Sequence, residues 1–517
     1  MTGKLMQFYI TTPIYYVNDI PHVGHSYTTI VADIMARWKR LNNYDVFFLT
    51  GTDEHGAKIA AAAKAKDVTP QKLCDEMSAK FRQAWELLNI SYTDFIRTTE
   101  QRHSIAVEKI IQILFDKGLI FKKKYEGLYC VGCERFYVPK DLDESGCCLF
   151  HKTKPVLQSE ENYFFKLSSF QNALLERITD PHHEEYIEIQ PEERRNEIIG
   201  KLKLGLEDVS FSRTAIEWGI PVPFDKEQTV YVWVDALVNY IAAIGYPENK
   251  SKFQKYWAAD IHLMAKDILW FHSVIWPAIL IGAGLSLPKK VYSHGFFTLN
   301  GSKMSKSLGN VISPKELVDK YGVDAARYLM ATLIPFGHDG DISWQGLTLQ
   351  YNTDLANNLG NLISRTIKMA EKYFNLTAPR TEPNLELAKE VANILKKSFA
   401  QNMDNLELHK ASEVLRSAIT LVNRQIEIDA PWKLAKTDMN KLASCIYSYL
   451  QTADIIAMHM LPFMPVISEK IWQITGASGN INEVAKKYFA DTIIPAKGFS
   501  VSAAQLQASE ILFPRIA

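Results

Sequence analysis

The sequence predicts an α/β protein in which a doubly wound, Rossmann-like parallel sheet precedes an α-helical bundle. Short apolar strands alternate with amphipathic helices from Gln7 to about Leu114, as they do in open α/β sheets. The same alternation resumes after a stretch that lacks it. Beyond Trp344, strand signals nearly vanish and helical repeats run from about Tyr351 to Ile474, which is typical of a bundle.

The first half of the expected sheet starts with the apolar strand Phe8–Ile10 and a helix opened by His22. Apolar residues in that helix recur at three- and four-residue spacing, so one face should pack inward. They are Tyr27, Ile30, Val31, Ile34, Trp38 and Leu41. Val46–Leu49 is predicted to be a buried parallel strand. It leads into the polar segment Thr50–Gly56, at the edge where open α/β sheets bind ligands.

The stretch from about Gly118 to Lys226 is predicted to be an insertion between the two halves of the sheet. It contains a cysteine cluster and little strand–helix alternation. The sheet should resume with the strands Val230–Val234 and Ile261–Met264. The expected domains are 1–117 (first half), 118–227 (insertion, with a knuckle at about 125–160), 228–290 (second half), 291–350 (a loop and connecting region) and 351–517 (helical bundle and tail).

Composition limits the classes of protein that fit. A chain of 517 residues should fold into several domains. Its 58 basic residues balance 58 acidic ones, so a nucleic-acid partner would depend on local patches rather than on a global field. No apolar stretch approaches the roughly 20 residues of a membrane helix, and Met1–Leu5 lacks the apolar core of a secretory signal. We therefore expect a cytoplasmic protein with no membrane partner.

The cysteine cluster has the spacing of a closed tetrahedral zinc site. Cys130-x-x-Cys133 is followed by Cys148-x-x-His151, and two such pairs can supply four ligands. Cys147 competes with Cys148, but only Cys148 leaves the usual two-residue gap before the histidine. The alternative is ordinary buried cysteines beside a surface histidine, which the double pairing disfavours. Four protein ligands leave no open position, so Zn²⁺ should be structural.

Two short segments, His22–His25 and Lys303–Ser307, carry the chemistry of phosphate binding. Two imidazoles three residues apart lie on one face of a helix's first turn, where free N–H groups favour anions. The second segment supplies lysine ammonium groups and serine hydroxyls. Together the segments resemble the HIGH and KMSKS signatures of class I aminoacyl-tRNA synthetases, with Val23 where isoleucine is frequent. That resemblance implies ATP binding and activation of an amino-acid carboxylate.

Further segments resemble one branch of that family, the methionyl-tRNA synthetases, and specifically the bacterial type with a single knuckle. The insertion is too short to hold the large editing domain of the leucine, isoleucine and valine enzymes. The matching segments are Thr12–Asn18, Thr50–Gly56, Tyr231–Ala236 and Lys266–His272. The resemblance extends from about Tyr9 to the C-terminus.

The resemblance implies the site residues position by position. The methionine pocket would be lined by Ile14, Tyr16, Asp53, Trp233, Leu237, Tyr240 and His272. ATP would be bound by His22, Gly24, His25, Asp267, Lys303, Ser305 and Lys306. Of these, His22, His25, Lys303 and Lys306 would be catalytic, and Asp53 would accept from the substrate ammonium. Leu237 stands where some members have proline. Spacing alone favours Trp233 and Tyr240 as core aromatics, and only the resemblance assigns them to the pocket.

In the helical half, Asn361, Arg365 and Trp432 resemble anticodon-reading positions. Asn361 and Arg365, four residues apart, share one helix face and could present donors to base edges. Trp432 offers a ring on which an unstacked base can lie. The alternative for Trp432 is a helix-cap aromatic that follows a proline.

The implied function is ATP-dependent attachment of L-methionine to initiator and elongator tRNAs with the anticodon CAU. The reaction would pass through methionyl-adenylate, with release of pyrophosphate and AMP. Mg²⁺ and a structural Zn²⁺ are the expected cofactors, and a monomer is the expected state. Two alternatives stay open: a class I synthetase for leucine, valine or cysteine, and a synthetase relic that holds tRNA without catalysis. Pyrophosphate exchange tested with each amino acid in turn separates them.

Overall fold

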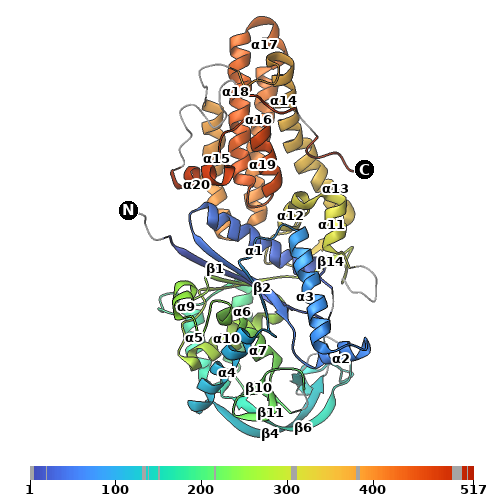
Figure 1. Ribbon diagram of the computed structural model, residues 1–517, viewed down its shortest axis with the longest axis vertical. Helices are drawn as coiled ribbons and strands as arrows, with labels where there is room; N and C mark the ends of the chain where they lie inside the picture. The colour runs from blue at the N-terminus through green and yellow to red at the C-terminus, as the bar shows by residue number, and fades with distance from the viewer. Residues whose placement is uncertain are drawn as a thin grey trace.

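The structure is a computed structural model, and Figure 1 shows how its elements are arranged. A helical bundle lies at the top, a parallel sheet in the middle and an antiparallel sheet at the bottom. The described residues are 5–18, 20–130, 135–137, 139–149, 152–214, 217–303, 311–379, 385–491, 504–508 and 511–517.

The middle layer is a six-stranded sheet in which every neighbouring pair of strands is parallel. In sheet order the strands are β3 (Asp94–Arg97), β2 (Asp45–Asp53), β1 (Gln7–Tyr16), β12 (Ile261–Ala265), β13 (Lys290–His294) and β7 (Glu188–Gln190). The chain runs outward from β1 to β2 and β3 in one direction and from β12 to β13 in the other, where the earlier strand β7 forms the edge. A crevice for ligands is expected where these two central strands end. The predicted doubly wound sheet is therefore confirmed, and β7 joins it from within the range 118–227.

Helix α1 (Val23–Leu41) lies between the sheet and the bundle. The six apolar residues predicted to face inward are all buried, and so are Ala32, Met35 and Ala36. On one side α1 contacts β1, β2 and β12. On the other side it contacts α12 (Val323–Thr332), α15 (Glu386–Asp404) and α20 (Ile481–Asp491). The predicted helix is confirmed, but it is covered on two sides rather than one.

The prediction of a parallel-sheet strand at Val230–Val234 is wrong. Strand β11 (Asp225–Val230) ends there and belongs to a small antiparallel sheet with β9 (Ser212–Arg213) and β10 (Pro221–Val222). Helix α7 (Val232–Leu237) follows, and the N–H groups of Val234 and Asp235 in its first turn donate to the carbonyl of Tyr231. A short apolar run fits the core in either conformation, so its pattern does not distinguish a strand from a buried helix.

The bottom layer is a four-stranded antiparallel sheet from the predicted insertion. Its strands, in sheet order, are β5 (Arg135–Tyr137), β4 (Ile120–Cys130), β6 (Val156–Phe165) and β8 (Val209–Ser210). β4 and β6 pair along most of their length. Figure 1 shows that this sheet lies at the end of the molecule opposite the bundle.

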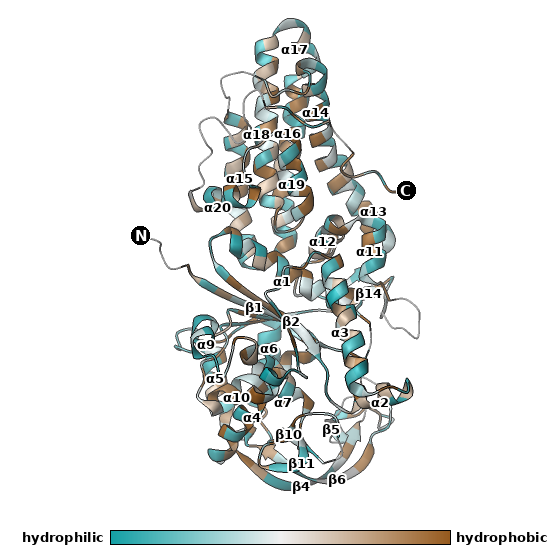
Figure 2. Cartoon of the chain, in the orientation of Figure 1, coloured by the Kyte–Doolittle hydropathy of each residue, from teal (hydrophilic) through white to brown (hydrophobic). Residues whose placement is uncertain are grey.

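The bundle confirms the predicted helical half. Its helices include α14 (Asn361–Phe374), α15, α16 (Leu408–Asp429), α17 (Pro431–Thr437), α18 (Met439–Met460) and α19 (Pro465–Ile474). Figure 2 shows both hydrophobic and hydrophilic residues along these helices. Buried apolar residues form one continuous core from a face of the parallel sheet, through α1, into the bundle. In the described part of the chain, no helix is long and apolar enough to cross a membrane.

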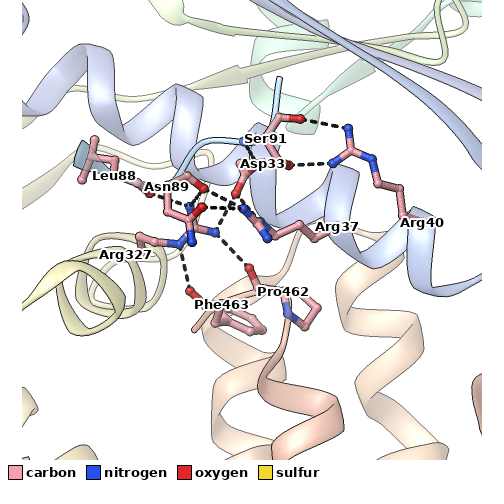
Figure 3. Close-up of polar contacts among 9 residues, drawn as sticks. All are labelled: Asp33, Arg37, Arg40, Leu88, Asn89, Ser91, Arg327, Pro462 and Phe463. Atoms are coloured by element: carbon pink, nitrogen blue, oxygen red, sulfur yellow. Dashed lines mark hydrogen bonds and ion pairs between the residues drawn. The ribbon is translucent and has the colours of Figure 1, made fainter. Parts of the chain in front are cut away.

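The junction between sheet and bundle is organised around Arg327 of α12, which has no exposed surface (Figure 3). Its guanidinium donates to the carbonyl oxygens of Phe463 at 3.0 Å and Pro462 at 3.1 Å, in the turn between α18 and α19. It also donates to the carbonyl of Leu88 at 3.1 Å and pairs with Asp33 of α1 at 2.7 Å. One side chain thus holds three chain segments together.

Candidate active site

A cavity of about 340 Å³ opens where β1 and β12 end, at the position that the sheet topology predicts. Its walls come from β1, the first turn of α1, the end of β2, α7, α8 (Asn239–Ala242) and the turns after β12 and β13. The predicted residues that line it are Ile14, Tyr16, His22, Gly24, His25, Asp53, Trp233, Leu237, Tyr240, Asp267 and His272. The fold therefore brings together residues that are far apart in the sequence.

His22 and His25 form the N-terminal cap of α1. The Nδ1 atom of His22 accepts from the N–H of Gly24 at 3.1 Å, and the Nδ1 atom of His25 accepts from the N–H of His22 at 3.4 Å. The two rings stack with centroids 3.8 Å apart. A Cβ on Gly24 would come within 3.0 Å of the His22 ring, so glycine makes room for this cap.

Burial determines the charge of the two rings, and the cap determines which nitrogen carries the proton. Burial lowers the pKa of His22. Burial and the neighbouring His22 lower the pKa of His25 well below 6.5. Both rings are therefore neutral near pH 7. Because each Nδ1 accepts a backbone hydrogen bond, the single proton lies on Nε2. The helix start thus offers two Nε2–H donors beside the positive end of the helix dipole, an arrangement that suits an anion.

An aromatic slot forms another part of the cavity wall. The Trp233 ring stacks on Phe271 with centroids 4.3 Å apart and meets the edge of Tyr16 at 5.8 Å. Leu237, one turn further along α7, lines the same wall. Trp233 and Tyr240 therefore face a cavity, whereas spacing alone had favoured them as core residues.

Two polar side chains of the slot, His272 and Tyr240, are hydrogen-bonded to each other and uncharged. His272 Nδ1 lies 2.9 Å from the carbonyl of Ile268 and must donate to it, so Nε2 accepts from the Tyr240 hydroxyl at 2.6 Å. Burial lowers the pKa of His272 to about 4, which keeps the ring neutral. The Tyr240 proton is engaged by His272, and the slot favours an apolar, polarizable group.

Two carboxylates also line the cavity. Asp53 ends β2 and is only 2% exposed, and Asp267 lies in the turn after β12. A buried carboxylate favours a cationic partner, and an ammonium group would form charge-assisted hydrogen bonds with it.

The second signature is described only where it begins. Ser302–Lys303 forms β15 and pairs with β14 (Phe297–Leu299), whose first residue lines the cavity. The turn between them is held by Asp341, which accepts from the Gly301 N–H and the Thr298 hydroxyl. The Lys303 side chain, Ser305 and Lys306 lie outside the described residues.

Comparison with known proteins identifies the family. The family model described as "tRNA synthetases class I (M)" matches residues 8–148 and 133–367. The model described as "Anticodon binding domain of methionyl tRNA ligase" matches residues 377–510. The chain belongs to the methionyl-tRNA synthetase family.

Members of that family resemble the chain over nearly its whole length. The methionine–tRNA ligase of Caldanaerobacter subterraneus is 44% identical over 98% of this chain and 79% of its own length. That of Streptomyces coelicolor is 40% identical over 98% of this chain and 96% of its own. The Mycobacterium tuberculosis methionyl-tRNA synthetase, solved in complex with methionyl-adenylate, is 35% identical with a TM-score of 0.92, and the match covers 99% and 100% of the two chains.

The residues predicted to read the anticodon lie in the bundle, away from the cavity. Asn361 and Arg365 share the face of α14 that contacts α16, where the Asn361 amide donates to Asn423 at 3.3 Å and Arg365 pairs with Glu427 at 2.7 Å. Trp432 lies on α17 with 42% of its surface exposed. Figure 1 shows α17 at the top of the bundle, and a half-exposed aromatic ring on that helix could stack on a base.

Only half of the predicted zinc site falls within the described residues. Cys130, at the end of β4, and Cys148 are both buried in a small cluster with Tyr137, whereas Cys133 and His151 lie outside those residues. Among the described residues alone, no group of three or more potential ligands could hold a metal. One cysteine from each predicted pair nevertheless lies buried in the same place, which fits the donor chemistry of a structural Zn²⁺.

Several cavity residues were not predicted from the sequence. Among them are Ala236, Asn239, Ile268, His294, Phe296 and Phe297, together with Tyr27 and Thr28 on α1. His294 ends β13, where its Nδ1 donates to the carbonyl of Gly295 and its Nε2 accepts from the Thr28 hydroxyl at 2.6 Å. A histidine followed by a glycine after an apolar run was a usable signal, because the carboxyl ends of parallel strands meet at the ligand edge.

Proposed function

We propose that the chain attaches L-methionine to its tRNA at the expense of ATP, through methionyl-adenylate. One observation carries this proposal. A single cavity holds two neutral imidazole donors at a helix N-terminus together with an uncharged aromatic slot and a buried carboxylate. These are the complements of a phosphate chain, a thioether and an ammonium group. Family membership supports the same assignment.

Methionine would bind with its thioether in the slot formed by Trp233, Tyr240 and Leu237, along with Ile14, Tyr16 and His272. Sulfur makes favourable contacts with aromatic rings and needs no strong hydrogen-bond partner. Asp53 would accept from the ammonium group, and that charge-assisted bond fixes the carboxylate for reaction.

In the first step, a carboxylate oxygen attacks the α-phosphorus in line. An oxygen–phosphorus bond forms, the bond to the β-phosphate oxygen breaks and pyrophosphate leaves. The Nε2–H groups of His22 and His25 would donate to phosphate oxygens as charge develops, while Lys303 and Lys306, with Ser305 and Gly24, would hold the phosphates. Catalysis of this kind depends on positioning and electrostatic stabilisation.

Mg²⁺ fits the donors of this cavity. The ion takes oxygen ligands, commonly substrate phosphates with one or two carboxylates, and Asp267 is a cavity-lining carboxylate of that kind. When bound to ATP, Mg²⁺ would neutralise part of the phosphate charge.

In the second step, a 3′-terminal ribose hydroxyl of the tRNA bonds to the carbonyl carbon. The bond between carbonyl and phosphate breaks, and AMP is released. Asn361, Arg365 and Trp432 would read the CAU anticodon of initiator and elongator tRNAs. A structural Zn²⁺ held by Cys130, Cys133, Cys148 and His151 would stabilise the insertion. We also propose that the protein acts as a monomer in the cytoplasm, in keeping with a role in translation.

Amino-acid-dependent pyrophosphate exchange tests the proposal. Methionine should give the highest kcat/KM. A hydrophobic pocket separates substrates that differ by one methylene by roughly 10–200-fold, so leucine and valine should fall well below. Higher kcat/KM with leucine, valine or cysteine would assign the chain to another branch. Binding of tRNA without any exchange would indicate a relic.

A matched pair of tryptophans tests the slot itself. Trp233→Ala removes a cavity wall, so KM for methionine should rise by about 10–100-fold, as the loss of one large buried apolar contact implies. Trp270 is partly buried close by, outside the cavity lining. Trp270→Ala should leave KM for methionine within about twofold of wild type. Equal changes of KM in the two variants would show that Trp233 does not form part of the methionine slot.

A further inference from the structure

Behind the methionine slot lies a buried cluster that the proposed chemistry does not use. The carboxylate of Asp235, on α7, has no exposed surface. One of its oxygens is 2.6 Å from His55 Nδ1 and the other is 2.6 Å from His103 Nε2. His55 follows the end of β2, and His103 belongs to α4 (Gln101–Asp116). The cluster therefore connects three separate elements.

The direction of the hydrogen bonds follows from the charges. Burial alone would raise the pKa of Asp235, but the bonds and charge of His55 and His103 outweigh it and lower that pKa to about 2. The carboxylate is thus ionised and can only accept, so both histidines donate to it. His103 Nδ1 is buried and, among the described residues, has no hydrogen-bond partner.

The cluster is linked to the slot by the backbone, because its residues are close in sequence to residues that line the cavity. Although all three residues belong to the described part of the chain, none of them lines the cavity. Asp235 lies between the wall residues Trp233 and Leu237 on α7, and His55 lies two residues after Asp53. One carboxylate is therefore tied to both the aromatic wall and the strand end that carries the ammonium-binding group.

Helix α7 depends on such contacts because it is short. It has only six residues, and an isolated helix of that length is not stable in water. Its orientation must come from packing and from tertiary hydrogen bonds. Two hydrogen bonds to a buried charged group are stronger and more directional than apolar contacts. One comes from the segment after β2 and the other from α4.

We propose that Asp235 and His103 are positioning residues of the methionine pocket. Asp235 holds α7 against the end of β2, and His103 anchors Asp235 from behind. One wall of the slot is formed by Trp233 and Leu237, and Asp53 lies on the other. These contacts keep the two walls at the separation that methionine requires. This inference rests on the proposed function, because it assumes that the slot binds methionine.

Substitutions at His103 separate the hydrogen bond from packing. His103→Leu fills the site but removes the donor to Asp235. His103→Gln also removes the ring, but its amide nitrogen can take the place of Nε2. KM for methionine and for ATP would be measured by pyrophosphate exchange, with the active fraction determined by adenylate burst titration, so that partial unfolding does not alter the comparison.

His103→Leu should raise KM for methionine by about tenfold, the lower end of what one hydrogen bond to a charged group contributes. KM for ATP should stay within about twofold, because His22 and His25 lie on α1 and do not contact the cluster. His103→Gln should restore KM for methionine to near the wild-type value. An unchanged KM for methionine in His103→Leu overturns the proposal, and so does an equal rise in both variants.

A second pair covers the case in which His103→Leu does not fold. His55→Leu removes the other donor, whereas the amide of His55→Asn can replace Nδ1. The same rise and the same rescue are expected, and their absence overturns the proposal. Trp233→Ala separates an error in the slot assignment from an error in the positioning role. If that variant leaves KM for methionine unchanged, the slot is misassigned. If KM rises there but not in the histidine variants, only the positioning role fails.

Discussion

Asp33 and Asp235 are both fully buried on helices that pack against the catalytic core, but arginines surround the first and histidines surround the second. Burial alone would raise the pKa of Asp33, yet Arg37 and Arg327 outweigh it and hold that pKa well below its usual range. Figure 3 shows both arginines converging on this carboxylate. A guanidinium keeps its charge at any physiological pH, so Arg37 and Arg327 stay charged beside Asp33 throughout that range.

The Asp235 cluster differs because a histidine charge depends on pH. Burial disfavours the charged ring of His55, but Asp235 and Glu54 outweigh that effect and raise the pKa of His55 above 6.5. Permanent charges thus lie where sheet and bundle meet, whereas a titratable group lies behind the aromatic slot. Two aspartates that are equally buried can therefore differ in function. One forms ion pairs that do not depend on pH, and the other pairs with a histidine whose charge does.

The largest expected effect tests the arginine side of this comparison. Arg327→Met leaves three carbonyls without their donor and removes one of the two arginines from Asp33. Breaking a buried ion pair by removing one partner costs about 3–5 kcal/mol, and urea unfolding would measure this loss. Arg327→Lys keeps the charge without the planar fork, so its loss should be smaller. A loss under about 1 kcal/mol in Arg327→Met would show that the junction is held by apolar packing instead.

A smaller effect tests the histidine side through pH. Because the pKa of His55 is raised in the folded state, its contribution is fully present below pH 6.5 and is lost as pH rises through the raised value. The stability advantage of wild type over Asp235→Asn should therefore shrink as pH rises above 6.5. Urea unfolding at a series of pH values measures this difference.

Two features make that pH series specific. The pKa values of His22 and His25 are lowered by burial, so their contributions are lost only as pH falls below 6.5. Arg327→Lys should run parallel to wild type over the same window, since no lysine or arginine group at the junction loses its charge there. A constant difference between wild type and Asp235→Asn at all pH values would show that His55 does not carry the charge.

The smallest effect is a reference for charge pairing without burial. Lys315 and Asp319 pair on the surface of α11 (Pro314–Tyr321), with side chains 74% and 58% exposed. Lys315→Ala should change the free energy of unfolding by less than about 0.5 kcal/mol, as exposed pairs of this spacing do. A change as large as that of Arg327→Met would mean that charge pairing alone, rather than burial, explains the junction.

Local pattern was sufficient to predict much of the fold. Helix α1 follows from its three- and four-residue apolar spacing. Strands β2 and β12 follow from short apolar runs that end at polar segments. The position of His22 and His25 at a helix start was predicted from their spacing, but the hydrogen bonds by which they cap the helix were not. The slot residues came from a family resemblance rather than from pattern, and the fold brings them to one cavity.

Long-range partners could not be predicted in the same way. Arg327 and Asp33 lie in segments far apart in the chain, and the local sequence around each residue does not predict that they form an ion pair. Asp235 was visible as a charged residue inside an apolar run, which signals a buried polar group. Which histidines satisfy it depends on how α4 and the end of β2 meet α7. That run was also mistaken for a strand, because its apolar residues suit either conformation.

The burial of α1 on two sides has a consequence for distance. Its first turn carries His22 and His25 at the cavity, and near its last turn Trp38 and Lys39 both donate to Asp404 at the end of α15, at 2.9 and 2.8 Å. At 1.5 Å per residue, its 19 residues span about 28 Å. Inserting one residue would rotate one end by about 100° relative to the other. The backbone of a single helix therefore fixes both the distance and the relative rotation between the His22–His25 cap at the cavity and the bundle.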